Sequence, residues 1–299
     1  MYSPIAIFAY NRPEHLRKTV EALAGDPLAR HSDLFIFSDN AKTSEHAANV
    51  ALVRGYVSRI TGFQSVNITE RVENMGLANS IEAGVSSLCN RFGRVIVLED
   101  DLLVRPGFLE FINTALDRYE NEKSVYQVSG YMYPGDYISS DDACFLPLIS
   151  CWGWGTWKRA WSEFNLDLSG LDDLKTNADL AYRFNINGSY DYLGMARQQK
   201  TGKINSWGIC WYLNVFMKNG LTLFPRKSFV QNIGVDSSGT HGAGHGKLQE
   251  MLDNSISYNQ PLKFPAEIVP NIEVLVLLSK LLKPLNQSLL NRIYGWIKK

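Results

Sequence analysis

The feature that most constrains this chain is a short apolar run that ends in three consecutive carboxylates. Residues 94–101 read Arg-Val-Ile-Val-Leu-Glu-Asp-Asp, so four apolar residues are followed at once by Glu99, Asp100 and Asp101. A short apolar run bounded by charge predicts a buried parallel strand. Open α/β sheets bind ligands at the carboxyl ends of such strands. We therefore expect a ligand site at this corner.

Three like charges at one point repel each other unless a cation lies among them. Divalent ions such as Mn²⁺ and Mg²⁺ suit the place, because hard cations bind both carboxylate and phosphate oxygens. Asp101 is best placed to hold the ion, and Asp100 and Glu99 to hold ribose or sugar hydroxyls. The alternative is that Asp101 only caps the next helix. The first interpretation predicts a nucleotide-dependent transferase, in which the ion neutralises a departing diphosphate.

Strand and helix signals alternate over residues 1–130. The expected strands lie at 5–9, 34–37, 66–68, 94–98 and 125–128, with segments of helical spacing between them. This order predicts an α/β fold with a mostly parallel sheet covered by helices on both faces. We assign 1–130 to nucleotide-sugar binding.

The rest of the chain has a different pattern. Residues 131–270 are rich in Trp, Tyr, Gly and Asn, so we expect an irregular region that carries the acceptor side and active-site loops of the same domain. Residues 271–299 have apolar residues at helical spacing and only basic charges after Glu273, which predicts a basic amphipathic helix. Such a helix either contacts an anionic membrane or docks on the protein, and Pro284 interrupts it.

Composition narrows the class of protein. The 299 residues are 45% hydrophobic and 20% charged, which is typical of a folded globular protein. The formal net charge is zero, so we expect no nucleic-acid partner. The four cysteines lack CxxC spacing and are interpreted as core thiols in a reducing cytosol. With no signal-peptide pattern and no apolar run of about 18 residues, we expect a cytoplasmic protein, with peripheral membrane contact through 271–299 as an open alternative.

Three other polar segments follow predicted strands or precede a predicted helix. Ala9 and Tyr10 end the first strand, Arg12 follows it, Asp39 ends the second strand, and Asn74 precedes a helix. Because parallel strands end at one edge of a sheet, we expect these residues to bind the donor, with Arg12 on the nucleoside or diphosphate. Asp39 would accept a hydrogen bond from the base or ribose. Taken singly, each segment is equally compatible with a turn or a cap.

An aromatic and glycine-rich motif occupies residues 152–161. Glycines allow close approach of a ligand, and aromatic faces stack on sugar C–H surfaces. We therefore expect Trp152, Gly153 and Trp154 to line the donor pocket, whereas Trp157 and Trp161 are equally compatible with the core. Residues 234–246 are small and glycine-rich, which predicts a flexible loop that closes on the donor and brings His241 to the ion or the diphosphate.

In their order, these motifs resemble those of GT-A fold glycosyltransferases. More narrowly, the chain resembles bacterial surface-polysaccharide transferases related to the eukaryotic N-acetylglucosaminyltransferase that starts complex N-glycans. The resemblance covers roughly residues 4–245 and is carried by 7–13, 38–39, 95–101, 151–157 and 232–241. It implies a Rossmann-like GT-A sheet.

The resemblance also implies an activity and a set of roles. Asp101 would coordinate Mn²⁺, with His241 near the diphosphate, and the donor would be a nucleotide sugar, most commonly a UDP-sugar. The enzyme would transfer a hexosyl or N-acetylhexosaminyl group to a lipid-linked or other glycan in the synthesis of a cell-surface polysaccharide such as lipopolysaccharide.

One residue departs from the family pattern. Gly208, in Ser-Trp-Gly-Ile-Cys-Trp, stands where the related eukaryotic enzyme has its catalytic carboxylate. An inverting transferase needs a base for the acceptor hydroxyl, and Asp236, Glu163 and Asp167 are the candidates. We expect inversion, with retention as the alternative. Two other functions stay open: a non-catalytic glycan-binding protein, and a sugar nucleotidyltransferase, although the N-terminal glycine-rich loop typical of that class is missing.

Overall fold

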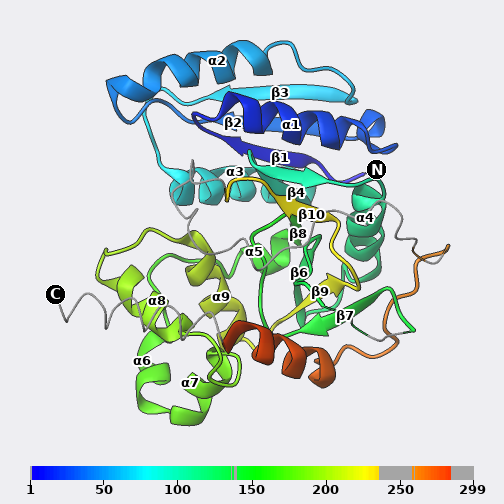
Figure 1. Cartoon of the computed structure of the whole chain (residues 1–299), viewed down its shortest axis with the longest axis vertical. Helices are drawn as coiled ribbons and strands as arrows, with labels where there is room; N and C mark the ends of the chain where they lie inside the picture. The colour runs from blue at the N-terminus through cyan, green and yellow to red at the C-terminus, as the bar shows by residue number, and fades with distance from the viewer. Residues whose placement is uncertain (1, 136, 138–139, 236–257, 259, 284–299) are drawn as a thin grey trace.

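The computed structural model of the chain describes residues 2–135, 137, 140–235, 258 and 260–283. A single sheet of eight strands crosses the molecule in the order β3-β2-β1-β4-β8-β6-β9-β7 (Figure 1). Its first four strands are parallel, and they coincide with the apolar runs of the sequence: β1 Ile5–Ala9, β2 Asp33–Ser38, β3 Ser65–Glu70 and β4 Arg94–Glu99. The predicted α/β fold with a mostly parallel sheet is confirmed.

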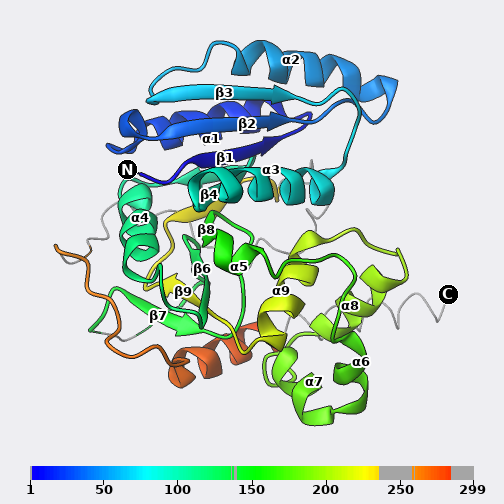
Figure 2. The same ribbon diagram turned by 180° about the vertical axis from the view of Figure 1, so that it is seen from behind.

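Helices cover both faces of this sheet. Helix α1 lies in front of it in Figure 1, and α3 lies in front of it in the reverse view of Figure 2. Helix α1 begins at Pro13, where the missing N–H costs no hydrogen bond, and α3 is capped at its carboxyl end by Gly93, which takes a left-handed φ of 81°. The bounds are α1 Pro13–Ala24, α2 Ala47–Val57, α3 Leu77–Phe92 and α4 Phe108–Arg118, with 3-10 turns η1 Ala29–His31 and η2 Ser44–His46.

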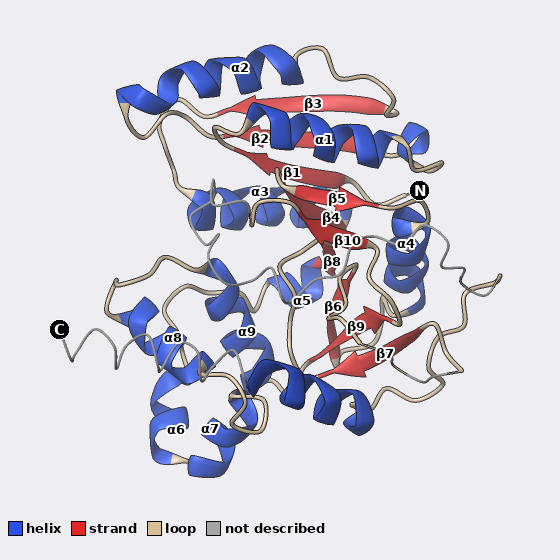
Figure 3. Ribbon diagram, viewed as in Figure 1, coloured by secondary structure: helices blue, strands red, loops and turns tan. Residues whose placement is uncertain are grey.

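The second half of the sheet is built from residues beyond 120. Strand β8 (Trp154–Trp157) lies antiparallel between β4 and β6 (Val125–Ser129). Strand β9 (Leu221–Pro225) follows, and β7 (Ala143–Leu146) forms the edge. A separate antiparallel pair joins β5 (Leu102–Val104) to β10 (Val230–Asn232). Strand β5 begins directly after Asp101. The sheet thus continues across residue 130 (Figure 3).

Residues 131–270 contain more regular secondary structure than the irregular region expected there. Besides the strands, they contain five helices among the described residues: α5 Lys158–Trp161, α6 Leu171–Thr176, α7 Ala178–Phe184, α8 Tyr192–Lys200 and α9 Trp207–Met217. Helix α9 is buried from Trp207 to Phe216, and a helix buried on all sides has no polar face to give it a periodic pattern.

The described part of the C-terminal segment is a helix at 272–283. Val274, Leu278 and Leu282 are buried in an apolar cluster with residues of α9, so this face of the helix docks on the protein itself. Residues 284–299 lie outside the described part of the chain. In the ranges that the structure describes, no helix has both the length and the apolar character needed to cross a membrane.

Candidate functional site

The acidic corner lies at the carboxyl end of β4 and is held together by Arg12. The Arg12 guanidinium, which follows β1, contacts Asp100 Oδ1 and lies 2.9 Å from Asp101 Oδ2. Asp100 also accepts the backbone N–H of Tyr10 at 3.2 Å, and its carbonyl accepts the hydroxyl of Thr19 at 3.0 Å. The strand ends of β1 and β4 thus meet as expected, because their parallel register aligns Phe8 with Glu99.

The guanidinium of Arg12 faces the carboxylates of this corner, and the pKa values of Glu99 and Asp100 are shifted. Burial, followed by repulsion from Asp101 and Asp100, raises the pKa of Glu99 to about 8. Burial raises the pKa of Asp100 to about 6, although Arg12 opposes the shift. Burial alone would lower the pKa of Arg12, but Asp100 and Asp101 raise it above its usual value. The corner therefore carries an excess of negative potential that favours a further cation.

Asp101 has the oxygen best suited to such a cation. Its Oδ1 atom is buried and has no hydrogen-bond partner among the described residues. Its other oxygen faces Arg12, and its backbone carbonyl accepts the N–H of Ile233 at 2.8 Å. Gly234 covers the carboxylate so closely that a Cβ there would lie 2.0 Å from Asp101 Oδ2. This close approach was not predicted, and the only signal for it in the sequence is a glycine two residues after the end of β10.

The described residues by themselves do not complete a metal site. They contain no group of three or more His, Cys, Asp or Glu side chains that could together hold an ion. The free Asp101 oxygen fits an ion whose other ligands are phosphate oxygens and water, since Mg²⁺ and related ions keep such ligands in nucleotide sites. His241, the other expected ligand, lies outside the described residues.

Asp39 and Asn74 lie next to each other, but they stabilise a turn instead of presenting free groups to a ligand. The Asp39 carboxylate accepts the backbone N–H groups of Asn40, Met75 and Gly76, each at 2.9 Å, and the Asn74 amide at 3.1 Å. A carboxylate offers about four acceptor positions, so all of them are used within the protein. Asp39 thus holds the turn before α3 and has no free position for a base or ribose.

Ala9 and Tyr10 form the wall next to this turn. The Ala9 carbonyl accepts the N–H of Asp39 at 2.9 Å, which ties the ends of β1 and β2 together. The Tyr10 hydroxyl lies 2.7 Å from His46 Nδ1 and accepts the Lys42 N–H at 2.9 Å. Tyr10 therefore fixes the loop that follows β2 beside the corner.

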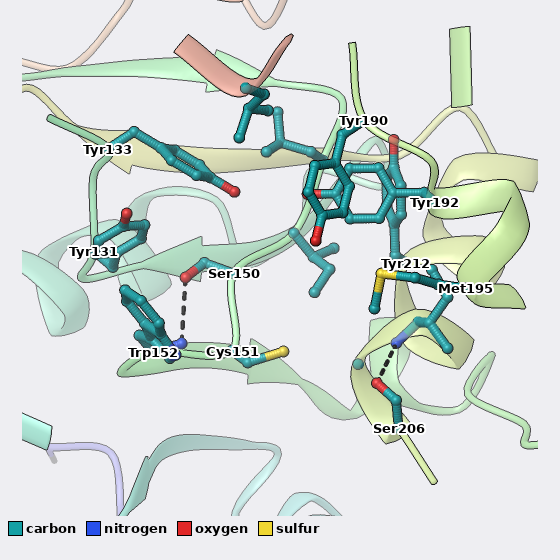
Figure 4. A pocket seen from close by; sticks show the side chains of 15 residues that line it. Tyr131, Tyr133, Ser150, Cys151, Trp152, Tyr190, Tyr192, Met195, Ser206 and Tyr212 are labelled. Atoms are coloured by element: carbon teal, nitrogen blue, oxygen red, sulfur yellow. Dashed lines mark hydrogen bonds between the residues drawn. The ribbon is translucent and has the colours of Figure 1, made fainter. Parts of the chain in front are cut away.

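A pocket of about 190 Å³ lies on the other side of the corner, between the start of β8 and helices α8 and α9 (Figure 4). Trp152 lines it, and the Trp152 ring packs edge-on against Tyr131 with centroids 4.6 Å apart. The pocket adjoins the corner because β8 runs antiparallel to β4, with Trp154 opposite Val97, so the residues before Trp154 lie toward the carboxyl end of β4. The tyrosines of this pocket were not predicted, since they are scattered over several segments.

Trp154 and Gly153 do not line this pocket. Trp154 has no exposed surface and stacks on Trp207 with centroids 5.4 Å apart. Gly153 is buried, and a Cβ there would lie 2.8 Å from Val230 Cγ2. We therefore assign both residues to the core rather than to a donor-pocket wall.

Glu163, an expected catalytic base, lies far from the corner. Glu163 follows α5, which begins at Lys158. The Lys158 N–H donates to the carbonyl of Gly93, so α5 begins near the amino end of β4. A six-residue strand spans roughly 20 Å, so the two ends of β4 are well separated. Glu163 instead pairs with Lys218 at 2.9 Å, just beyond the end of α9. The structure does not support it as the base, and Asp236 lies outside the described residues.

Comparisons with known proteins give one sequence relative and several structural ones. No family model matches the chain. The alpha-1,3-mannosyl-glycoprotein 2-beta-N-acetylglucosaminyltransferase of Arabidopsis thaliana is 22% identical over 175 residues, which cover 54% of this chain and 38% of that enzyme. The chain thus matches well under half the length of its curated relative.

Three solved structures share part of the architecture. GalNAc-T7 with UDP, GalNAc and Mn²⁺ has a TM-score of 0.46 at 10% identity, over 77% of this chain and 44% of that chain. TarS of S. aureus has a TM-score of 0.43 at 8% identity, over 77% and 36%. The mannosyltransferase PcManGT of Pyrobaculum calidifontis, in complex with GDP-Man and Mn²⁺, has a TM-score of 0.41 at 10% identity, over 73% and 70%. With TM-scores below 0.5, the functional argument rests on the site itself.

Proposed function

We propose that this protein is a metal-dependent glycosyltransferase that transfers a sugar from a nucleotide-sugar donor to a glycan acceptor. The observation that carries the proposal is the buried oxygen of Asp101, which has no hydrogen-bond partner among the described residues and lies in a corner of excess negative charge. An aromatic pocket that suits a sugar adjoins this corner. The partial likeness to an Arabidopsis N-acetylglucosaminyltransferase supports the same class of reaction.

In this proposal the residues of the corner have distinct roles. Asp101 would hold Mn²⁺ or Mg²⁺, which when bound supplies the charge that stabilises a departing diphosphate. Arg12 balances Asp100 and Asp101 and keeps their carboxylates in place before the donor arrives. Asp39 holds the turn at Asn74 that borders the nucleoside side. Glu99, at the very end of β4, is placed to meet sugar hydroxyls.

The finer assignment follows from the sequence resemblance. We infer a UDP-sugar donor, and an acceptor that is a lipid-linked or other glycan of a cell-surface polysaccharide. Among the described residues, no Asp, Glu or His lines the aromatic pocket. We infer that the proton of the acceptor hydroxyl goes to Asp236 in an inverting reaction, with transfer to the leaving phosphate in a retaining reaction as the alternative.

The exposed face of the helix at 272–283 supports contact with an anionic membrane. Ile272, Val276 and Leu277 are exposed there, next to Lys280 and Lys283. Vesicles with anionic lipid should therefore retain the protein in a flotation assay, whereas purely zwitterionic vesicles should not. Equal flotation with both vesicle types would contradict this contact.

The central test compares wild-type protein with Asp101→Ala over a panel of UDP-sugars and Mn²⁺. Loss of the ion's carboxylate should lower transfer or donor hydrolysis by roughly a hundredfold or more, which corresponds to several kcal/mol of leaving-group stabilisation. The control is Asp172→Ala, which removes an exposed carboxylate paired with Lys175 on α6. Equal activity of wild type and Asp101→Ala would refute the metal role.

The same panel separates the alternative functions. Sugar binding without turnover for every donor would favour a glycan-binding protein, and consumption of a nucleoside triphosphate would favour a nucleotidyltransferase. NMR analysis of the product would give the donor sugar, the linkage and the anomeric configuration together.

A further inference from the structure

The aromatic pocket beside the corner has two facing walls. Tyr131, Tyr133 and Trp152 form one wall, and Tyr190 and Tyr192 with Tyr212 form the other (Figure 4). Rings within each wall contact each other edge-on or at a tilt, with centroids 4.6 Å apart for Tyr131 and Trp152 and 4.7 Å apart for Tyr190 and Tyr192. At about 190 Å³ the pocket is smaller than sites for drug-sized ligands, so it holds about one ring.

Among the residues that the structure describes, the lining of this pocket carries no ionisable acid or base other than tyrosine and cysteine. None of the described side chains that line it is Asp, Glu, His, Lys or Arg. Several of its polar atoms already have partners: the Tyr212 hydroxyl donates to the Phe184 carbonyl at 2.8 Å, and Ser150 Oγ accepts the Trp152 N–H at 3.2 Å. Burying a charge without a partner is costly, so an anionic group would bind poorly here. A neutral ring with apolar C–H faces suits the walls.

Gly208 and Cys151 meet at the floor of the pocket. Both line it, and a Cβ at Gly208 would lie 2.6 Å from Cys151 Sγ. The thiol therefore occupies the space that any larger residue at 208 would need. In Figure 4 the Cys151 sulfur points into the space between the two walls. The glycine that departs from the family pattern is thus matched by a neighbouring side chain.

We propose that this pocket selects a neutral sugar ring over an anionic one, and that Gly208 and Cys151 together set how deeply the ring enters. Naming the ring as part of a donor or an acceptor rests on the glycosyltransferase function proposed above. The proposed selectivity does not rest on that function, because it is argued from the uncharged lining formed by the described residues and from the contact between Gly208 and Cys151.

Binding of matched sugar pairs tests the selectivity directly. The probes are methyl β-glucoside with methyl β-glucuronide, and methyl β-galactoside with methyl β-galacturonide, followed by saturation-transfer NMR without metal or donor. Each pair differs only in a CH₂OH group replaced by a carboxylate. We expect at least one neutral glycoside to bind about tenfold more tightly than its anionic counterpart. Equal or tighter binding of the anionic member, or no binding of either neutral glycoside, would overturn the proposal.

A set of variants tests the floor. Gly208→Ala should push the thiol into the pocket and weaken binding of the neutral glycoside about tenfold, the effect of one methylene in a tight site. The double variant Gly208→Ala with Cys151→Ala should restore binding to within about twofold, because contacting residues are not additive. Gly55→Ala, in an open position on α2, is the matched control. Full binding by Gly208→Ala, or no recovery in the double variant, would contradict the assigned role.

Two further arms separate this proposal from the proposed function. Adding a UDP-sugar with Mn²⁺ should displace the glycoside if the pocket holds the donor's ring, and should leave it bound if the pocket holds the acceptor's. Selective glycoside binding without any transfer would reject the glycosyltransferase function while keeping the pocket's selectivity. Transfer that proceeds equally to neutral and anionic sugars would reject the selectivity while keeping the function.

Discussion

Replacing Gly234 with alanine tests whether the chain after β10 controls the acidic corner. The added Cβ would lie 2.0 Å from Asp101 Oδ2 and 2.8 Å from Arg12 Nη1, which is far inside normal contact distance. The backbone cannot easily retreat, because Ile233 N–H donates to the Asp101 carbonyl at 2.8 Å and Gly234 N–H to Asn232 Oδ1 at 2.7 Å. The Asp101 carboxylate must therefore turn away from Arg12.

The cost of this change follows from overpacking and from a weakened charged contact. Overpacking a tight site costs about 1–3 kcal/mol, and a hydrogen bond to a charged group contributes about 1.5–3 kcal/mol. We expect the free energy of unfolding to fall by roughly 2–4 kcal/mol, and Tm to fall by about 4–16 °C at roughly 2–4 °C per kcal/mol. Calorimetric titration with Mn²⁺ and UDP should show affinity lowered by about tenfold or more, since the carboxylate is displaced.

A matched substitution elsewhere controls for the effect of a glycine-to-alanine change. Gly55 lies on the exposed face of α2 with no atom within 4 Å of an added Cβ. Gly55→Ala should raise stability by about 0.5–1 kcal/mol, because alanine favours the helix, and should leave Mn²⁺ affinity unchanged. If Gly234→Ala kept both the wild-type Tm and the wild-type Mn²⁺ affinity, the reasoning about this contact would be refuted.

Three further predictions concern acidic residues. Because the pKa of Glu99 is raised to about 8 in the folded protein, ionisation of Glu99 lowers the stability of the fold as the pH rises from about 4.5 to about 8. Glu99→Gln should therefore raise the free energy of unfolding by roughly 2–4 kcal/mol above that pH range and hardly at all below it, as measured by urea denaturation. Asp39→Ala removes four acceptor contacts and should destabilise the protein by about 2–4 kcal/mol and speed amide exchange at Gly76; unchanged exchange there would refute the turn-holding role. Glu163→Ala should leave sugar transfer within about twofold of wild type and cost at most about 1 kcal/mol, since its partner Lys218 is half-exposed. A large loss of transfer in that variant would restore Glu163 as a base candidate.

Much of the corner could be predicted from local sequence. The apolar run before Glu99 determines a buried strand, and parallel strands bring the residues after β1 to the same edge, which is why Arg12 meets Asp100 and Asp101. The engagement of Asp39 could not be predicted in the same way. Its partners lie on a turn about 35 residues away, and only the folded chain shows that they use every acceptor position.

The aromatic motif shows where sequence patterns become ambiguous. Trp152 and Trp154 both adjoin Gly153, yet Trp152 lines the pocket and Trp154 is fully buried. The difference comes from tertiary packing, because β8 inserts between two strands and its residues are covered from both sides. Helix α9 is a similar case, since its continuous burial removes the amphipathic pattern by which a helix is usually predicted.

The reversed direction of β8 has a consequence for how such a molecule can diversify. The acidic corner and the aromatic pocket are adjacent because β8 begins at the carboxyl end of β4 and ends at its amino end. The residues proposed to bind the nucleotide and those proposed to select the sugar thus come from separate segments of the chain. Mutations can reshape one set while the other stays intact, so under the proposed function the sugar specificity could change while the acidic corner is kept.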